Sequence, residues 1–334
     1  MWDGVAALVG VDWLARALRP HIQQPHMLQP HIQPTHPQPI VLHAEWSEGG
    51  ARSTYADGHI PGALSFDTDW LENGYPTWQL LPAVLLQRRF GDVGVRATDT
   101  IVVYAQQYAA ACRVWWVLRY CGATDVRVLC GGLNAWCAAG LPVATTPAER
   151  IPTAFSAGVQ SALLADSDAV QSAAQMGRLI DVRSSDEYRG LRSGYSYLQR
   201  VGRIPGALHA DAEPLTALLD CADLPGIAAY WQACGVLRAT DAQPGACDAS
   251  AALVFYCGSG WRSSVACFCA QLLGMHDARN YSDGWCGWST RYVRDTAEAD
   301  IRSGDGLPSD QPQLLAGSTP GWRQLATGKP IATG

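Results

Sequence analysis

Residues 253–264 read LVFYCGSGWRSS and set the expected fold of the chain. The apolar and aromatic run from Leu253 to Tyr256 is typical of a buried strand. Cys257 follows that strand directly, two glycines loosen the next backbone, and a helix is expected to open at Ser263. A strand, a short loop and a helix in this order make up one unit of an α/β sheet.

The loop after Cys257 has the composition of an anion-binding cradle. The first N–H groups of a helix have no intrahelical partner, and the helix dipole adds partial positive charge there. Backbone amides around Gly258 and Gly260 can converge on one anion, and Arg262 adds a cation at the rim. Such surroundings stabilise a thiolate, so Cys257 is the predicted nucleophile. The alternative is an inert buried thiol, since the chain holds 11 cysteines.

Short apolar runs alternate with helical patterns along the chain, which predicts an α/β fold with parallel sheets covered by helices on both faces. In the first half we expect strands at 40–44, 100–104 and 126–129 and helices at 81–90, 113–119 and 131–136. In the second half we expect strands at 179–182 and 252–256 and helices at 163–175, 225–234 and from 283 onward.

The second half of the chain repeats the first. The segment Ile-Pro-Gly-Ala follows His59 and again follows Arg203 (203 − 59 = 144), and Gly132 is matched by Gly284 (284 − 132 = 152). Matches in the same order at a nearly constant offset indicate duplication of one unit. The expected division is a first domain at 1–147, a linker at 148–162 and a second domain at 163–334.

The two copies differ at the position of the nucleophile. Ala105 stands 152 residues before Cys257 (257 − 152 = 105), and the six residues after it include no glycine. Only the second domain is therefore expected to be catalytic, and the first is expected to be an inactive copy.

The loop and the repeated segments resemble those of the rhodanese sulfurtransferases. Cys257 to Arg262 matches the six-residue active loop of that family, and Cys-Gly-Ser-Gly is most similar to the 3-mercaptopyruvate enzymes, whereas Trp261-Arg262 departs from them. The resemblance implies two tandem rhodanese-like domains. It also implies transfer of a sulfane sulfur from thiosulfate or 3-mercaptopyruvate to a thiol or cyanide through a cysteine persulfide.

The resemblance further implies roles for individual residues. Arg183 and Arg189 match positions that bind the carboxylate or sulfonate of the substrate, and Ser259 and His59 match two members of a proton relay. The structural alternatives are that Arg183 pairs with Asp186 or Glu187 and only holds the loop, and that His59 caps a strand. The expected catalytic residues are Cys257, Ser259 and Arg262, and the expected substrate-binding residues are Arg183, Arg189, Gly258, Gly260, Trp261 and His59.

Two other functions fit parts of this pattern. Cysteine-dependent phosphatases and arsenate reductases use the same strand, cysteine and helix, but they need five residues between cysteine and arginine. Here four residues separate Cys257 from Arg262, so the loop length favours the sulfurtransferase. A persulfide carrier or interaction module without small-molecule turnover is the second alternative.

Composition narrows the class of protein. With 334 residues, of which 48% are hydrophobic and 16% charged, the chain has room for two globular domains. A formal charge of −6 gives no reason to expect nucleic acid or an anionic membrane as a partner. No apolar run approaches the ~18 residues of a transmembrane helix, and the acidic N-terminus is unlike a signal peptide.

The cysteines and histidines indicate the compartment and the absence of a resident metal. An odd number of cysteines without paired metal spacing is typical of reduced thiols in a cytoplasmic protein. We expect no cofactor, and as partners a small-molecule sulfur donor and a thiol, cyanide or protein acceptor. Residues 20–39 are rich in His, Gln and Pro, with a histidine every five residues. This tract is interpreted as a surface insertion, with metal binding as the alternative.

Overall fold

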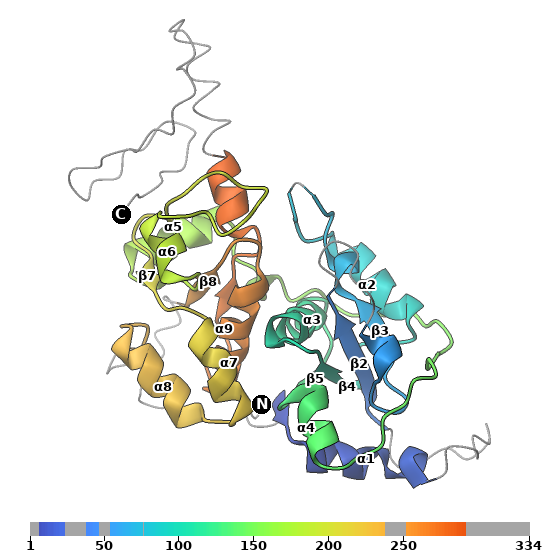
Figure 1. Ribbon diagram of the computed structural model, residues 1–334. Helices are drawn as coiled ribbons and strands as arrows, with labels where there is room; N and C mark the ends of the chain where they lie inside the picture. The colour runs from blue at the N-terminus through green and yellow to red at the C-terminus, as the bar shows by residue number, and fades with distance from the viewer. Residues whose placement is uncertain (1–6, 24–37, 47–53, 76, 238–251, 292–334) are drawn as a thin grey trace, which may run out of the picture.

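The computed structural model describes residues 7–23, 38–46, 54–75, 77–237 and 252–291. Two parallel sheets lie side by side in this part of the chain, each flanked by helices, which confirms the predicted α/β fold (Figure 1). The first sheet has the order β1 (Leu8–Val9), β5 (Asp125–Leu129), β4 (Thr100–Tyr104), β2 (Ile40–Glu45) and β3 (Leu64–Asp67). The second has the order β7 (Leu208–His209), β6 (Leu179–Asp181), β8 (Val254–Tyr256) and β9 (Arg279–Asn280).

Helices cover both faces of the first sheet because its strand residues alternate between two apolar cores. Ile101 and Val103 belong to the core under α2 and α3, whereas Val102 and Tyr104 belong to the core under α1 and α4. The helices are α1 (Val11–Gln23), α2 (Ala83–Asp92), α3 (Tyr108–Tyr120) and α4 (Gly132–Ala138), with short 3-10 turns at Tyr55–Asp57 and Thr68–Leu71.

The second sheet follows the same plan with fewer strands. Its helices are α5 (Ser167–Gln175), α6 (Ser185–Arg189), α7 (Glu213–Asp220), α8 (Leu224–Ala233) and α9 (Trp261–Leu272), and a closing helix runs over 284–291. Phe255 lies in the core with α7, α8 and α9, and Val254 and Tyr256 lie in the core with α5 and the closing helix.

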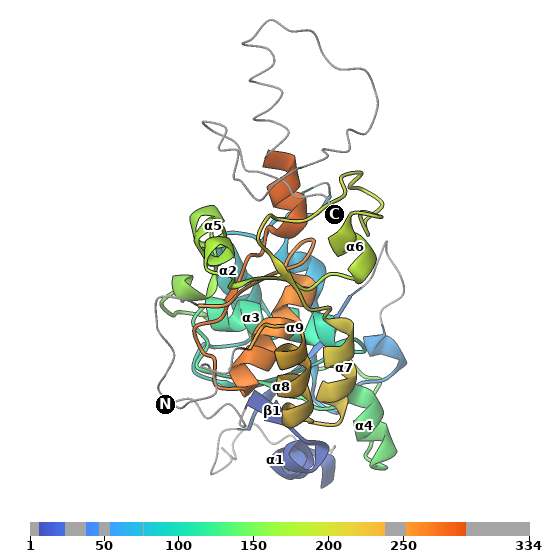
Figure 2. The ribbon, with the colours of Figure 1, turned by 90° about the vertical axis from the view of Figure 1, so that its left-hand side faces the viewer.

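The two domains meet through α3 and α9, which pack against each other between the sheets (Figures 1 and 2). The ring centroids of Trp115 and Phe268 are 4.9 Å apart in an edge-on contact across this boundary. Both helices are buried around most of their circumference, as expected for helices enclosed on all sides. One hydrophobic cluster consequently runs from the first sheet through α3 and α9 to the second.

The predicted repeat is visible as a repeated contact. The hydroxyl of Tyr104 accepts a hydrogen bond from the amide of Ile60, and the hydroxyl of Tyr256 accepts one from the amide of Ile204, each at 3.1 Å. In both domains, therefore, the end of the central strand holds the Ile-Pro-Gly-Ala turn at the carboxyl edge of the sheet.

Several predicted boundaries are wrong. Helix α3 begins at Tyr108, five residues before the predicted 113. Helix α9 begins at Trp261, two residues before Ser263, so Arg262 lies inside its first turn. Helix α5 begins at Ser167 and not at 163, because the side chain of Asp166 caps it by accepting from the amide of Ala169. Helix α1 continues to Gln23 and overlaps the start of the 20–39 insertion, and residues 24–37 of that insertion lie outside the described residues.

The predicted linker at 148–162 runs along the first domain with fixed contacts. The amide of Thr153 donates to the carbonyl of Gly91 at 2.9 Å, and the ring of Phe155 lies 5.7 Å from that of Phe90. The domain boundaries themselves stay a prediction. Among the described residues, no helix is long and apolar enough to cross a membrane, and no group of His, Cys, Asp or Glu is arranged to hold a metal ion.

Candidate active site

Cys257 lies at the carboxyl end of β8, where the following backbone turns into α9. The amide of Trp285 donates to the Cys257 carbonyl at 2.7 Å, and the amide of Cys286 donates to the Gly258 carbonyl at 3.0 Å. Because the N–H and C=O of a trans peptide point in opposite directions, the N–H groups of Gly258 and Ser259 point away from the closing helix. Two loop amides thus face the same side, as an anion cradle requires.

A serine at the start of α9 lies behind the thiol. The Ser263 hydroxyl lies 3.5 Å from the Cys257 sulfur and 2.8 Å from the Asn280 side-chain oxygen. A hydroxyl has one proton to donate, so Ser263 can serve either acceptor. Asn280 also donates to the carbonyl of Gly260 at 3.0 Å, which fixes the far end of the loop. Ser263 is fully buried, and Cys257 itself is 1% exposed.

Arg262 is paired with a carboxylate. Its guanidinium forms a bidentate ion pair with Glu187 at 2.7 and 2.8 Å and donates to the hydroxyl of Tyr195 at 2.6 Å. Burial alone raises the pKa of Glu187, but the hydrogen bonds and charge of Arg262 hold it below its usual range. The predicted cation at the loop is present, and the structure adds a counter-ion that the sequence analysis did not include.

A tyrosine-rich segment covers the loop. A methyl group added at Gly258 would lie 1.9 Å from the ring and hydroxyl of Tyr195, so a larger residue there would displace that side chain. The ring of Tyr197 lies 5.5 Å from that of Tyr195, and 6.4 and 6.0 Å from the rings of Tyr75 and Trp78 in the first domain. Aromatic side chains from both domains therefore meet beside the loop that follows Cys257.

The first domain reaches the catalytic loop through a buried ion pair. Arg113 of α3 donates to Glu72 at 2.8 Å, to the hydroxyl of Ser282 at 2.9 Å and to the carbonyl of Gly260 at 3.3 Å. Glu72 also accepts from the indole N–H of Trp261 at 2.8 Å. The side chains of Arg113 and Glu72 are 0% and 2% exposed, so this network is closed to solvent.

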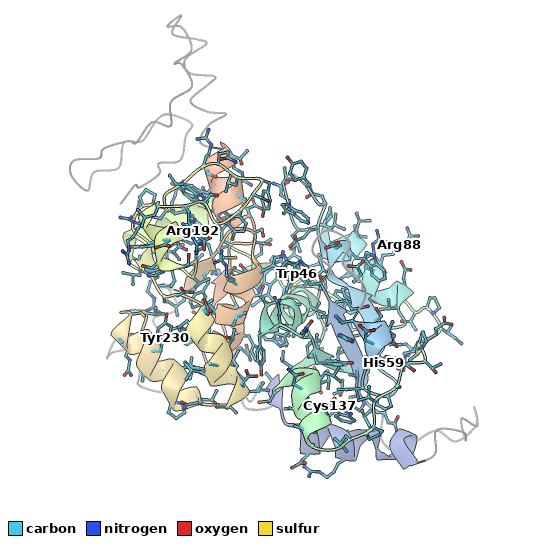
Figure 3. The ribbon with its side chains drawn as sticks, viewed as in Figure 1. Trp46, His59, Arg88, Cys137, Arg192 and Tyr230 are labelled. Carbon is cyan, nitrogen blue, oxygen red and sulfur yellow. The ribbon has the colours of Figure 1, made fainter. Side chains whose placement is uncertain are left out.

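Trp261 has a second aromatic neighbour from the first domain. The ring of Trp46 lies 5.6 Å from that of Trp261, and Figure 3 shows Trp46 between the two domains. Since Trp46 is 43% exposed, this pair lies at the outer end of the domain boundary. Trp261 therefore connects the loop to the first domain on both its polar and its apolar side.

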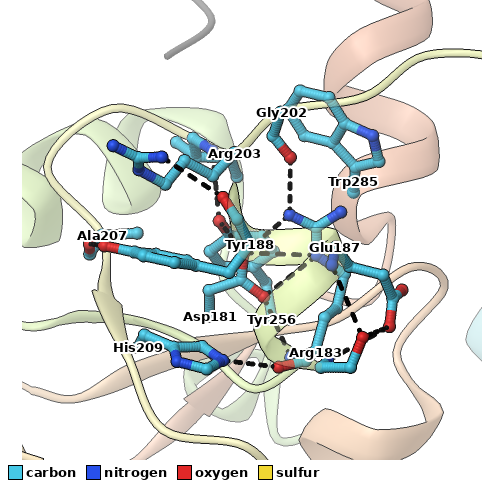
Figure 4. A network of polar contacts seen from close by, with 12 residues as sticks. Asp181, Arg183, Glu187, Tyr188, Gly202, Arg203, Ala207, His209, Tyr256 and Trp285 are labelled. Atoms are coloured by element: carbon cyan, nitrogen blue, oxygen red, sulfur yellow. Dashed lines mark hydrogen bonds and ion pairs between the residues drawn. The ribbon is translucent and has the colours of Figure 1, made fainter. Parts of the chain in front are cut away.

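Arg183 lies in a buried ion pair, and its role in substrate binding stays a prediction. Its side chain is fully buried and forms a salt bridge with Asp181 at 2.7 Å, and it donates to the carbonyl of Gly202 at 2.7 Å (Figure 4). The guanidinium also lies 5.1 Å from the ring of Trp285. Arg183 therefore fixes the backbone before the second Ile-Pro-Gly-Ala turn. The structural alternative holds with a different partner, because the carboxylate is Asp181.

The predicted relay between His59 and Ser259 is not assembled. His59 is fully buried in the first domain, where its ring stacks on Tyr55 at 3.7 Å. Its Nδ1 lies 2.9 Å from the Tyr55 carbonyl oxygen, and its Nε2 lies 3.2 Å from the Thr146 carbonyl oxygen. Figure 3 shows it on the side of the first sheet away from α9. Ser259 is half-buried, and its hydrogen-bond partner is Tyr197. A neutral imidazole has one N–H, so His59 donates to one of these two carbonyls, and both carbonyls belong to the first domain. Its role in a relay stays a prediction.

Arg189 remains a candidate for binding an anionic substrate. It is exposed at the end of α6, and its guanidinium contacts the Ser185 hydroxyl at 2.6 and 3.0 Å. Two residues before it, Glu187 binds Arg262, so α6 connects the exposed arginine to the catalytic loop.

Sequence reasoning missed Glu72, Arg113 and Tyr195. Each lies more than 60 residues before the loop (257 − 195 = 62), so local patterns could not link them to Cys257. One signal was available for Arg113, because a charged residue within the apolar run of a helix requires a buried partner.

Comparison with known proteins identifies the family of the chain. The family described as "Rhodanese-like domain" matches residues 44–139 and 161–291. The chain is 32% identical to the thiosulfate sulfurtransferase YnjE of Escherichia coli, covering 75% of this chain and 57% of that protein. It is 29% identical to human 3-mercaptopyruvate sulfurtransferase, covering 90% of this chain and 96% of that protein.

Solved structures give a further relative. A persulfide-bearing variant of EanB with ergothioneine has a TM-score of 0.70 and 27% identity, covering 86% of this chain and 69% of that one. An anaerobic ergothioneine biosynthesis enzyme from Chlorobium limicola, in complex with trimethyl histidine, has a TM-score of 0.69 and 28% identity, covering 86% and 69%. The two family matches, the duplicated sheets and the cysteine loop lead to one conclusion: the chain belongs to the rhodanese family.

Proposed function

We propose that the chain transfers a sulfane sulfur through a persulfide on Cys257. The observation that carries this proposal is the position of the thiol at the end of β8, with two loop amides turned to one side. The thiolate attacks the outer sulfur of the donor. With thiosulfate the S–S bond breaks, and with 3-mercaptopyruvate the C–S bond breaks. Sulfite, or the enolate of pyruvate, leaves with the electron pair.

The second half-reaction returns the thiolate. A thiol or cyanide attacks the outer sulfur of the persulfide, and the S–S bond to Cys257 breaks with its electron pair on the cysteine sulfur. Each step needs an anion to be stabilised at the loop, which the amides of Gly258 and Ser259 and the first turn of α9 can do. A protein thiol is a further acceptor for the same reaction.

The arginine geometry disfavours the phosphatase alternative. A phosphatase loop directs its arginine at the bound oxyanion, whereas both terminal nitrogens of Arg262 are bound to Glu187. The loop is also one residue shorter than that class requires.

The first experiment is intact-mass spectrometry after incubation with thiosulfate or with 3-mercaptopyruvate. We expect the wild type to gain the mass of one sulfur atom, cyanide to remove it, and Cys257→Ser to gain nothing. Cys221→Ser, which removes an exposed thiol, is the matched control and should load as the wild type does. If neither donor loads the wild type, the proposal fails. If loading occurs without turnover to any small acceptor, the carrier alternative holds.

A second candidate acceptor follows from the aromatic side chains beside the loop. Tyr75, Trp78 and Tyr197 meet across the domain boundary, and faces of such rings attract quaternary ammonium groups. The related enzyme from Chlorobium limicola binds trimethyl histidine. Incubating the persulfide form with trimethyl histidine and measuring ergothioneine by mass spectrometry tests this acceptor. Absence of product, with cyanide turnover intact, removes it.

The chain is proposed to work in a reducing, cytoplasmic setting. All ten described cysteines are free, including the buried Cys267 and Cys269 on α9. Burial raises the pKa of both of these thiols, which keeps them protonated beside the reactive one.

A further inference from the structure

A buried polar pair lies behind the thiol of Cys257, at the first turn of α9 and on β9. The Ser263 hydroxyl lies 2.8 Å from the Asn280 side-chain oxygen and 3.5 Å from the Cys257 sulfur. Ser263 and Asn280 are both 0% exposed. Burying polar side chains costs free energy unless their hydrogen bonds are made, so two of them beside one thiol call for an explanation.

The first domain has an apolar residue where the second has Ser263. Ala105 stands 152 residues before Cys257 (257 − 152 = 105). The same offset matches Ala111 to Ser263 (263 − 152 = 111), and each lies in the first turn of the helix that follows the central strand. Ala111 is 2% exposed, so this place in the first domain is buried without a hydroxyl.

Asn280 is replaced in the same way. It pairs with Phe255 between β9 and β8. Val128 pairs with Val103 between β5 and β4, and both positions differ by 152 residues (280 − 128 and 255 − 103). The domain without the cysteine therefore has buried alanine and valine in place of the polar pair. The pair thus occurs together with Cys257.

The neighbours of Asn280 fix the orientation of its amide. Its Nδ2 donates to the Gly260 carbonyl at 3.0 Å and to the Ser264 hydroxyl oxygen at 3.0 Å. A backbone carbonyl can only accept, so Nδ2 lies on that side and Oδ1 faces Ser263. The Ser263 hydroxyl therefore has two acceptors within reach, and its single proton can turn from Oδ1 to the cysteine sulfur.

The charge on the sulfur decides between the two acceptors. A neutral thiol is a weak acceptor, so the Ser263 proton is donated to Asn280. A thiolate accepts a charge-assisted hydrogen bond, which is stronger than a hydrogen bond between neutral groups. Because Cys257 is 1% exposed, water contributes little to stabilising a charge there, and a donor from the protein matters more.

We propose that Ser263 stabilises the Cys257 thiolate by turning its hydroxyl proton from Asn280 to the sulfur. The role of this contact in catalysis rests on the proposed sulfur transfer. That cycle needs the thiolate twice, when it attacks the donor and when the acceptor removes the outer sulfur. Ser263 acts in both steps, and Asn280 is a positioning residue that holds the hydroxyl beside the sulfur.

The test is the pH dependence of Cys257 alkylation by iodoacetamide in the full chain. Peptide mass spectrometry follows the reaction, because the chain holds 11 cysteines. Ser263→Ala should move the midpoint of the rate upward by about one pH unit, since a hydrogen bond to a charged group is lost. At a pH below the midpoint the rate should fall about tenfold, and at high pH it should equal that of the wild type.

Ser264→Ala is the matched control. Ser264 is also 0% exposed and bound to Asn280, but its hydroxyl donates to the Gly260 carbonyl at 2.7 Å. Its midpoint should equal that of the wild type. Ser263→Gly, which also lacks the hydroxyl, gives a second measurement in case Ser263→Ala does not fold. An unchanged midpoint without the Ser263 hydroxyl, or an equal shift in Ser264→Ala, overturns the proposal.

Alkylation needs no sulfur donor, so its outcome is distinguishable from that of the sulfur-transfer experiment. A shifted midpoint without persulfide loading by thiosulfate or 3-mercaptopyruvate supports thiolate stabilisation by Ser263 and overturns the sulfur transfer. Persulfide loading with an unchanged midpoint supports the sulfur transfer and overturns the role of Ser263.

Discussion

The two domains have the same frame and differ in the loop that this frame holds. Tyr104 and Tyr256 both receive the isoleucine amide of the Ile-Pro-Gly-Ala turn at 3.1 Å. Gly132 and Gly284 both begin the next helix with positive φ, and a methyl group at either would collide with the carbonyl of Ala105 or Cys257. These contacts are therefore present in the first domain although it has Ala105 in place of Cys257, because they stabilise the edge of the sheet whether or not a cysteine is there.

The two domains differ in the residues of the loop after the central strand and in the helix that follows it. The first domain has Ala105 and Gln106 where the second has Cys257 and Gly258. In exchange, α3 carries Arg113, which reaches the loop of the other domain. The second domain thus contains the proposed nucleophile Cys257, and the first domain contributes Arg113 to the loop that follows it.

The largest expected effect is the loss of sulfur transfer when Cys257 is replaced, and a cysteine in the corresponding loop of the first domain should not restore it. Cys257→Ser should reduce thiosulfate-to-cyanide transfer to background, and adding Ala105→Cys to that variant should not restore it. The second cysteine would lack the glycines that allow amides to converge on an anion. The measurement is thiocyanate formation, with persulfide mass as a second readout. Restored turnover would show that the frame alone is sufficient for activity.

Arg113→Leu tests whether the first domain supports the catalytic loop. It leaves Glu72 buried without its counter-ion, so the free energy of unfolding should fall by about 3–5 kcal/mol. The surface change Arg88→Leu, at a side chain that is 78% exposed, is the control and should change little. Adding Glu72→Gln to Arg113→Leu should recover part of the loss. If urea unfolding gave the same free energy of unfolding for Arg113→Leu and the wild type, the Arg113–Glu72 ion pair would not contribute to stability as expected.

His43 should make the first domain sensitive to acid. Burial lowers its pKa from 6.5 to about 4, so the unfolded chain takes up a proton before the folded chain does. The contribution of neutral His43 to the free energy of unfolding is fully present above pH 6.5 and is lost as the pH falls toward 4. Between pH 7.5 and 5.0 the loss from this residue is about 2 kcal/mol. Urea unfolding of His43→Phe should lack that component, whereas the exposed His276→Gln should retain it.

The smallest effect is expected at the exposed arginine of α6. Arg189→Ala should raise the KM for thiosulfate about tenfold without lowering the melting temperature, since its contact in the structure is to Ser185 alone among the described side chains. Arg192→Ala, on the same surface segment, is the matched control (Figure 3). An unchanged KM in steady-state assays would remove Arg189 from the substrate site.

The sequence predicted the features that are local or repeated. The run into Cys257 predicted the strand and loop, and the constant offset predicted both the second copy and Ala105. The start of α9 at Trp261 was predicted two residues late. Its N-cap is Gly260 in a left-handed backbone conformation, without the side-chain hydrogen bond of a Ser, Thr, Asp or Asn cap.

The two residues assigned by resemblance show a different limit. Arg183 and His59 occupy the expected segments, yet their side chains point into the protein. Arg183 pairs with Asp181 and leaves one terminal nitrogen without a hydrogen-bond partner among the described residues, and the ring nitrogens of His59 face backbone carbonyls. Tyr195 shows the reverse case, since an unremarkable tyrosine in a polar segment covers Gly258. Which side of a loop a side chain occupies is decided by packing and cannot be read from residue type.

The hydrophobic cluster that passes through α3 and α9 has a consequence for how the chain folds. If the two domains were separated, the side chains of Trp115 and Phe268 would be exposed to water. Neither domain alone therefore has a fully polar surface. The duplicated chain is therefore one cooperative unfolding unit, with a single transition expected for both halves. The first domain therefore has a structural role, because its helix α3 covers α9 of the second domain.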